Sequence, residues 1–323
     1  MNILLLGGAG YVGTIVAKRL VSAGNNLTII DLFYFSRQSD IEPFAHVKIG
    51  DTRDLELDDF RGMDAVVDMA AISNDPAGEL NPSITELINV RARIRAAELA
   101  RSAGVGRYLL LSSCSVYGAN DAIVDETAPL NPLTTYARSN AEAEKRILEL
   151  GDAGFCTTVF RLATVFGLSP GMRFDLVVNA MALSVFESGR LHITGGGEQY
   201  RPLVHIGDVA RAVELAVTAP RAEVNRQIFN IGHVNMRMHE VAQALLTGLA
   251  RPIEICVESS TLDKRNYRVA TTKAEKVLGF VANQTVANGA AAIITALENG
   301  TLEATPTAIR LNGYRRMVDR IVS

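Results

Sequence analysis

A glycine-rich turn near the start of the chain constrains its fold more than any other feature. Gly7, Gly10 and Gly13 follow the apolar run at residues 3–6 and open a segment whose apolar residues recur at helical spacing. Gly7 permits a tight bend, Gly10 lets the backbone approach a pyrophosphate, and Gly13 allows the helix to pack closely on the strand. A second apolar run follows at residues 27–30. The chain therefore opens with a strand–helix–strand unit typical of dinucleotide-binding sheets.

Short apolar runs without alternation continue beyond this unit, as in strands that are buried on both faces of a parallel sheet. They lie at residues 3–6, 27–30, 47–49, 65–71, 108–111 and 155–160. Helical patterns separate the runs, among them one at about residues 83–103 and one at about 135–150. Strand and helix thus alternate up to about residue 161, which predicts an α/β fold with a doubly wound parallel sheet.

The pattern changes after Gly167, where Ser-Pro-Gly at 169–171 and three glycines at 195–197 break the chain into shorter pieces. We expect a dinucleotide-binding domain at residues 1–167, to which residues 203–232 return as strand, helix and strand. Residues 168–202 and 233–323 then form a smaller α/β substrate-binding region. A length of 323 residues suits two such parts.

Composition excludes several classes of function. With 32 basic and 35 acidic residues the net charge is −3, so the chain offers no basic surface for nucleic acid. No run reaches the roughly 18 apolar residues of a membrane span. The 3 cysteines form neither a CxxC pair nor an even disulfide framework, and no cluster has metal-ligand spacing. We therefore expect a cytoplasmic protein that binds no nucleic acid, membrane or metal.

The end of the second apolar run indicates which dinucleotide binds. Asp31 stands there, where a carboxylate accepts hydrogen bonds from the adenosine ribose and repels a 2′-phosphate, so we expect NAD rather than NADP. Asp51 and Thr52 follow the third run at the same edge of the sheet, where Asp51 either contacts the adenine or caps the segment at Leu55. The expected cofactor contacts from these segments are Gly7, Gly10, Tyr11, Val12, Gly13, Asp31, Asp51, Thr52, Ala70 and Ala71.

Two further segments complete a pattern that resembles a known family. They are SSCSVYG at residues 112–118 and NPLTTYARSN at 131–140. With the glycine turn they resemble the extended short-chain dehydrogenase/reductases, specifically the nucleotide-sugar epimerase/dehydratases. The resemblance continues through RLATVFG at 161–167, GEQYRPLVHIGDVA at 197–210 and YRVATTKAEKVLGF at 267–280. It implies a Rossmann domain for NAD(P), a domain for a nucleoside-diphosphate sugar, and a homodimer built on the helices at 83–103 and 135–150.

The resemblance also implies roles for two hydroxyl groups. Tyr136 matches the acid/base tyrosine of the family, and Ser113 matches the residue that orients the reacting oxygen. The chemistry is sound, because a phenol can pass a proton to an alkoxide while a serine hydroxyl holds it in line. Judged from the residues alone, Ser113 is a strand-end hydroxyl and Tyr136 an aromatic anchor of a helix.

The expected function is NAD-dependent epimerisation of a nucleotide sugar by hydride transfer at a sugar carbon, C4. A one-way nucleotide-sugar ketoreductase or dehydrogenase is the alternative within enzymes. Simple 4,6-dehydration is disfavoured, because Cys114 and Ser115 stand where dehydrating members carry an acidic pair.

Asn140 is a departure from the family, which has a lysine four residues after the tyrosine. That spacing places residues 136 and 140 on one helical face, so we expect Tyr136 and Asn140 both to contact the cofactor, Asn140 through the ribose, and both to act in catalysis. An amide carries no charge, whereas an ammonium lowers the tyrosine pKa. A catalytically impaired dinucleotide or nucleotide-sugar binding protein is therefore a third hypothesis. If the missing charge at position 140 weakens an enzyme, Asn140→Lys should raise its turnover by orders of magnitude.

Substrate contacts follow from the same resemblance. Arg201 matches the arginine that binds the nucleotide diphosphate, and the donor fork of a guanidinium suits phosphate oxygens. Ser73 and Asn74 follow the fourth apolar run at its carboxyl end, where they can touch the sugar. We expect His205 to support a strand-to-helix junction. The expected substrate contacts are Ser73, Asn74, Ser113, Arg173, Asn179, Arg201 and Arg268.

Overall fold

The computed structural model describes residues 1–247, 249, 253–258, 265–305 and 308–322. Seven strands form its central sheet: β1 (Asn2–Leu6), β2 (Asn26–Asp31), β3 (His46–Ile49), β4 (Ala65–Asp68), β5 (Arg107–Ser113), β7 (Cys156–Leu162) and β11 (Gln227–Ile231). They pair in the order β11-β7-β5-β4-β1-β2-β3, and every pair is parallel. The predicted doubly wound α/β fold is confirmed.

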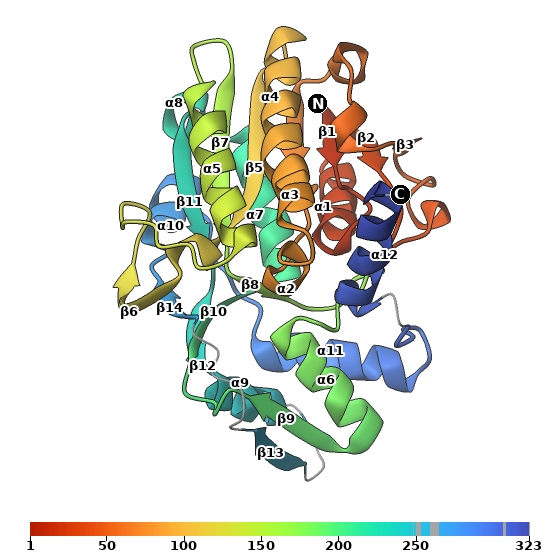
Figure 1. The fold of residues 1–323 in the computed structure, drawn as a ribbon, viewed down its shortest axis with the longest axis vertical. Helices are drawn as coiled ribbons and strands as arrows, with labels where there is room; N and C mark the ends of the chain where they lie inside the picture. Colours follow the sequence, from red (N-terminus) through yellow and green to blue (C-terminus); the bar gives the residue numbers. More distant parts are fainter. Residues whose placement is uncertain (248, 250–252, 259–264, 306–307, 323) are drawn as a thin grey trace.

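Helices cover both faces of this sheet (Figure 1). On one face α1 (Tyr11–Ser22) packs against α7 (Ile206–Thr218), and on the other lie α4 (Arg93–Ser102) and α5 (Thr135–Glu149). Successive residues of β1 serve the two cores in turn, since Ile3 and Leu5 belong to the first and Leu4 and Leu6 to the second. The predicted apolar runs lack alternation because both faces of each strand are buried.

The run at residues 65–71 was predicted as one strand, but β4 ends at Asp68. The Asp68 carboxylate accepts a hydrogen bond from the Ala70 N–H at 3.1 Å and turns the chain out of the sheet. The prediction was wrong for residues 69–71, which instead form a loop at the carboxyl edge. A hydrophobic pattern could not distinguish this loop from the strand because its residues are equally apolar.

The helix predicted at about 83–103 comprises α3 (Pro82–Glu86), a π-helical turn (Leu87–Ala92) and α4 in succession. A π-helical turn adds a residue to the helix repeat and shifts the face that the following residues present. Asn89 in this turn binds both backbone polar groups of Ile72, with distances of 2.9 and 3.0 Å. This helix therefore holds the loop that follows β4.

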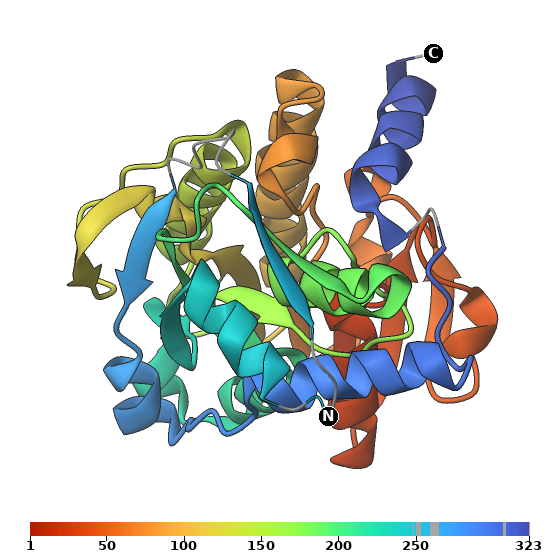
Figure 2. The same ribbon diagram turned by 90° about the horizontal axis from the view of Figure 1, so that it is seen from below.

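Smaller sheets lie at the carboxyl end of the large one. They join β8 (Thr164–Phe166), β10 (Tyr200–His205) and β12 (Val234–Arg237), then β9 (Arg190–Thr194) with β13 (Glu254–Glu258), and β6 (Ala119–Val124) with β14 (Asn266–Val269). Around them lie α6 (Val177–Ser188), α9 (Met238–Leu246), α10 (Thr272–Leu278) and α11 (Val286–Glu298), several of them visible from below in Figure 2, whereas α8 (Arg221–Val224) packs on β7 and β11 of the large sheet.

The segment at 203–232 was expected to return to the first sheet as a whole. Its helix α7 and its strand β11 do so, but the β10 part does not. After Leu162 the chain leaves β7 and continues as β8, which offers a free parallel edge outside the large sheet, and β10 pairs there instead.

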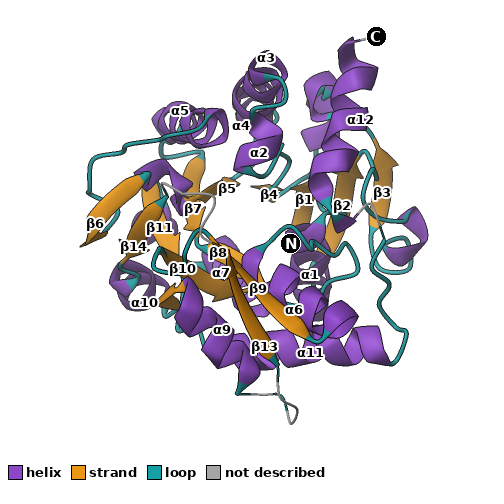
Figure 3. Cartoon of the chain, turned by 60° about the horizontal axis from the view of Figure 1, so that its bottom comes forward, coloured by secondary structure: helices purple, strands orange, loops and turns teal. Residues whose placement is uncertain are grey.

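The last helix, α12 (Arg310–Val322), returns to the carboxyl edge of the large sheet. It packs against α2 (Asp75–Gly78) and stands beside α3 and α4 in Figure 3. Tyr314 and Met317 form a small core with Ile72, Ala77 and Ile84. Among the described helices, none has the length and apolar character to cross a membrane.

Candidate active site

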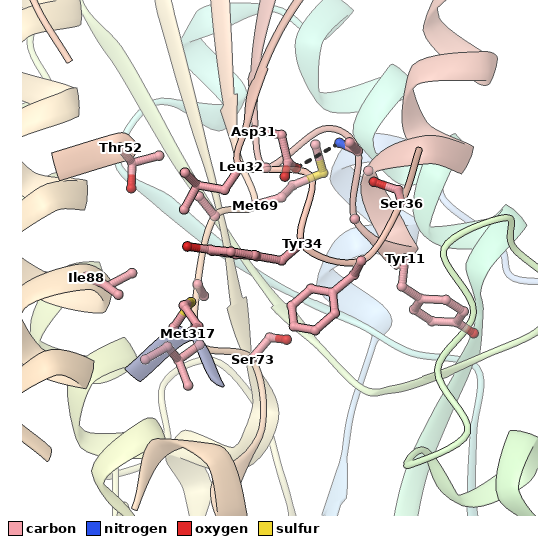
Figure 4. A pocket seen from close by; sticks show the side chains of 18 of the residues that line it. Tyr11, Asp31, Leu32, Tyr34, Ser36, Thr52, Met69, Ser73, Ile88 and Met317 are labelled. Atoms are coloured by element: carbon pink, nitrogen blue, oxygen red, sulfur yellow. Dashed lines mark hydrogen bonds between the residues drawn. The ribbon is translucent and has the colours of Figure 1, made fainter. Parts of the chain in front are cut away.

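The glycine turn, the end of β2 and the loop after β4 line one cavity at the carboxyl edge of the sheet (Figure 4). It lies between β1 and β4, where the chain order of the strands reverses, which is the usual ligand site of doubly wound sheets. The predicted residues Gly7, Gly10, Tyr11, Val12, Gly13, Asp31, Asp51, Thr52, Ala70 and Ala71 all line it.

The glycine turn fits an anionic group. A Cβ on Gly13 would lie 2.5 Å from the Gly7 carbonyl oxygen, and Gly7 itself has a φ of +74°. Both positions therefore require glycine. Gly10 is the N-cap of α1 and has no side chain to cap it, so N–H groups of the first helical turn face a cavity that a pyrophosphate can enter.

Asp31 lies at the end of β2 with its carboxylate held in place by two backbone donors. Oδ2 accepts from the Ala9 N–H at 3.0 Å, and Oδ1 accepts from the Phe33 N–H at 2.9 Å. Phe33 has a left-handed φ of 54°, which turns its N–H toward the carboxylate. Burial raises the pKa of Asp31, although these hydrogen bonds and the charge of Arg310 oppose the shift.

Asp51 is a helix cap that also borders the cavity. Its carboxylate accepts from the Arg53 N–H at 2.9 Å and caps a short 3₁₀ helix at Thr52–Asp54. The Arg53 guanidinium lies 2.7 Å from the other carboxylate oxygen. Burial acts to raise the pKa of Asp51, but the Arg53 hydrogen bonds and charge lower it overall. The capping interpretation is therefore confirmed, for residues 52–54 rather than for the segment at Leu55.

Sequence reasoning missed the far wall of this cavity, which α12 provides. Arg310, Tyr314 and Met317 line it, and the Tyr314 hydroxyl lies 2.9 Å from Ser73 Oγ. In Figure 4 the ring of Tyr34 lies across the cavity, between Asp31 on one side and Met317 on the other. The spacing i, i+4, i+7 of the three α12 residues marks one helical face. Nothing in the sequence indicates where that face docks.

A second cavity adjoins the first, because Tyr11, Val12, Ser73 and Arg173 line both. It contains Ser113 at the end of β5 and Tyr136 at the start of α5. Thr134 caps that helix by accepting from the Ala137 N–H at 3.1 Å, which places Tyr136 in its first turn. The two catalytic candidates therefore meet in one cavity.

The ionisation of Tyr136 depends on its neighbours. Burial raises its pKa and the carboxylate of Asp75 raises it further, while the charge of Arg93, a hydrogen bond with Ser113 and the charge of Arg173 lower it. Ser113 Oγ accepts from the Ser115 N–H at 3.1 Å, which holds this hydroxyl at the end of β5.

Asn140 requires a correction. It is 1% exposed and is absent from the described residues that line the two cavities, so the prediction that it points at the cofactor ribose was wrong. Its Nδ2 donates to the Tyr136 carbonyl at 3.1 Å, and its Oδ1 accepts from Arg93 Nη1 at 3.1 Å. The amide is held in this orientation because Arg93 on α4 donates to its oxygen. Its nitrogen donates to the Tyr136 carbonyl, which lies four residues earlier and therefore one helical turn away.

Two predicted substrate residues are also corrected. Asn179 is fully buried and bonds to Gly167 N–H, the Tyr11 hydroxyl and the Arg173 carbonyl. Arg268 donates to the Asp121 carbonyl and stacks on the Tyr200 ring at 4.8 Å. Neither belongs to the described lining of the second cavity, since packing and local hydrogen bonds hold each elsewhere.

Tyr11 lines both cavities, but its hydroxyl faces away from them. It donates to the Gly167 carbonyl at 2.8 Å and accepts from Asn179 Nδ2 at 3.1 Å. The cofactor contact expected of Tyr11 is therefore limited to its backbone and ring.

The other predicted substrate residues line the second cavity. Arg173 donates to Ser73 Oγ at 2.9 Å and pairs with Asp175, to which Asn74 also donates. Arg201 lies 7% exposed beside Arg265, which the sequence analysis missed and which pairs with Asp75. His205 caps α7 through the Gly207 N–H at 3.1 Å, which confirms its structural role.

Ser115 is a further missed residue of this cavity. Its hydroxyl is buried and has no hydrogen-bond partner within the described part of the chain. A buried polar group in this state is suited to a hydrogen bond with a ligand.

A doubly wound sheet with a glycine turn at its switch point defines the class of dinucleotide-binding proteins. The chain belongs to the NAD dependent epimerase/dehydratase family, whose sequence profile matches residues 3–232. The family consists of NAD-dependent enzymes, and this chain is one of them.

Individual relatives agree with this assignment. A UDP-glucose 4-epimerase of Lactobacillus helveticus is 26% identical over 304 residues, which are 87% of this chain and 92% of the relative. The structure of MoeE5 in complex with UDP-glucuronic acid and NAD superposes with a TM-score of 0.82 at 26% identity, covering 93% of this chain and all of that one. A dTDP-glucose 4,6-dehydratase from Streptomyces venezuelae superposes with a TM-score of 0.81 at 25% identity, covering 94% and 99%.

Proposed function

We propose that this chain is an NAD-dependent nucleotide-sugar epimerase that acts at a sugar carbon, C4, with Tyr136 as acid/base. The observation that carries the proposal is that Tyr136 and Ser113 line one cavity, which adjoins the glycine-turn cavity. The relatives described as UDP-glucose 4-epimerase and the MoeE5 complexes with UDP sugars and NAD support it.

The residues of the second cavity suit proton transfer at a sugar hydroxyl. Ser113 orients the hydroxyl, and the Tyr136 phenolate takes its proton and later returns it. The glycine turn would hold the NAD pyrophosphate, and Asp31 would accept from the adenosine ribose. Bound NAD supplies the hydride acceptor at the sugar carbon. Arg201 and Arg265 offer guanidinium donors for the diphosphate of the nucleotide sugar.

Cofactor use separates this proposal from its alternatives. The protein is incubated with a panel of UDP and dTDP sugars while the absorbance of reduced NAD is followed, and the products are separated chromatographically. An epimerase converts the sugar with no net change in reduced cofactor. A stoichiometric change would instead indicate a one-way reductase or dehydrogenase, and failure to convert any sugar would indicate a binding protein.

Asp31→Ala is expected to weaken NAD binding by about ten- to hundredfold, because hydrogen bonds to a charged group contribute about 1.5–3 kcal/mol. NADP binding should suffer less, since the carboxylate that repels a 2′-phosphate is gone. Asp31→Asn is the matched control, because it keeps the size of the side chain and one acceptor oxygen while it removes the charge and the second acceptor. Titration calorimetry measures both dinucleotides, and tighter binding of NADP by the unmodified protein would contradict the assignment.

We also propose a homodimer in which α4 and α5 pair with their symmetry mates as a four-helix bundle. The two helices lie side by side on one face of the sheet, and Leu87 and Leu133 are exposed near them. Light scattering at micromolar concentration tests this proposal. A mass near 34.8 kDa, that of one chain, would contradict it.

A further inference from the structure

The proposed base, Tyr136, needs a nearby positive charge. Burial and the carboxylate of Asp75 both raise its pKa, which disfavours the phenolate at neutral pH. Its own helix does not meet this need at position 140, where an uncharged asparagine stands. Lys145 is exposed and lies about 180° around the helix from Tyr136. The charge must come from another element.

The charged groups that act on Tyr136 come from three other elements. Asp75 lies on α2, where the guanidinium of Arg265 pairs with it. Arg173 lies in the segment after β8, where Asp175 neutralises it at 2.5 Å. Arg93 lies at the first position of α4. Of the two cations that act on the phenol, Arg93 has the more distant carboxylate, at 3.7 Å from Asp68.

Arg93 is only 3% exposed, and hydrogen bonds hold its guanidinium in place. Nε donates to the Ala70 carbonyl at 2.9 Å, and Nη1 donates to Asn140 Oδ1 at 3.1 Å. The π-helical turn directly before it sets the face on which its side chain enters the protein. Arg93 also lines the cavity that contains Tyr136 and Ser113. It is thus a buried cation with a defined position beside the proposed reaction site.

Asn140 links this cation to the base. Its Oδ1 accepts from Arg93 while its Nδ2 donates to the Tyr136 carbonyl, so one amide ties the guanidinium to the backbone of the catalytic tyrosine. A lysine at position 140 would place a second cation against Arg93 inside the protein, where like charges repel strongly. An asparagine is therefore suited to a site whose cation arrives from α4.

We infer that Arg93, positioned by Asn140, supplies the positive charge that allows Tyr136 to act as a base, so that α4 contributes the cation in place of α5. Arg93 acts through Tyr136 and is a positioning residue in this scheme. The inference rests on the proposed function, and it replaces the hypothesis that Asn140 leaves the site without a cation.

A charge-relocation cycle tests the inference with four proteins: the unmodified chain, Arg93→Gln, Asn140→Lys, and the double variant. Arg93→Gln keeps hydrogen-bonding capacity but removes the charge. Its loss raises the Tyr136 pKa, so the limb of the turnover–pH profile that rises with pH should move up by about one unit, with about tenfold lower turnover at neutral pH. In the double variant, the new ammonium should move the limb back toward that of the unmodified chain.

For Asn140→Lys alone, the inference predicts the opposite result from the hypothesis that Asn140 weakens the enzyme. Two cations then share one buried space, so the unfolding midpoint of the cofactor-free protein should fall by at least about 5 °C, and turnover should not rise. A gain of tenfold or more in turnover, with Arg93 in place, would overturn the inference. So would an Arg93→Gln variant that folds and keeps the pH profile of the unmodified protein.

Two controls make the outcomes separable. Arg93→Lys keeps the charge and should retain the limb within about half a pH unit, which a merely structural role of the guanidinium does not predict. If Arg93→Gln fails to fold, Asn140→Lys and Arg93→Lys still decide the question. Tyr136→Phe is assayed alongside, because an active Tyr136→Phe protein contradicts the proposed function itself, whereas an inactive one with an unmoved Arg93→Gln profile contradicts only the role of Arg93.

Discussion

Replacing Tyr136 by phenylalanine is expected to lower turnover of the nucleotide sugar by about 10²- to 10⁴-fold, because general acid–base catalysis by one side chain contributes on that scale. The phenol belongs to the lining of the second cavity together with Ser113. Removal of its hydroxyl leaves the ring and the packing of α5 in place, so NAD affinity and the unfolding midpoint should stay close to those of the unmodified protein.

Tyr200→Phe is the matched control for this loss. Tyr200 lies outside the described lining of both cavities and contacts Arg237 and Arg268 through its ring. The same loss of a hydroxyl there should leave turnover within about twofold. If Tyr136→Phe keeps more than about a tenth of the activity, another group must serve as the acid/base.

Glu144→Ala is expected to destabilise the protein by about 3–5 kcal/mol, the usual cost of removing one partner of a buried ion pair. The Glu144 carboxylate lies 2.7 Å from Arg161, and the two side chains are 2% and 3% exposed. Its other oxygen accepts from Ser112 Oγ. The substitution leaves a buried guanidinium without its carboxylate, directly beneath the strand end that carries Ser113.

Urea denaturation measures this loss against Glu86→Ala as control. Glu86 pairs with Arg91 at 3.1 Å, but the two side chains are 56% and 72% exposed, so this ion pair should contribute less than about 1 kcal/mol. Similar losses at the two positions would show that burial does not govern these ion pairs. A larger loss for Glu144→Ala than for Glu86→Ala would show that the buried ion pair beneath Ser113 stabilises the protein more than the exposed pair does.

Local sequence patterns were sufficient for the large sheet and the glycine turn. Apolar runs marked six of its seven strands, because a parallel strand covered on both faces needs apolar residues at consecutive positions, and the seventh was predicted as the last strand of the segment at 203–232. They did not mark β6 or β13, short strands with exposed positions, since a pattern of burial cannot reveal strands that are little buried. Gly13 and Asp31 were found because their roles depend on the conformation and position of their own segment.

The sequence by itself determined the strand–helix order, the dinucleotide turn and, through the resemblance, the meeting of Ser113 with Tyr136. The tertiary structure alone decided that α12 walls the cofactor cavity, that Asn179 and Arg268 bond elsewhere, and that Arg93 reaches Asn140. The reason is physical. Backbone periodicity is set by neighbours along the chain, whereas the partner of a buried charge is set by which helix packs beside it, and Arg93 and Asn140 stand 47 residues apart.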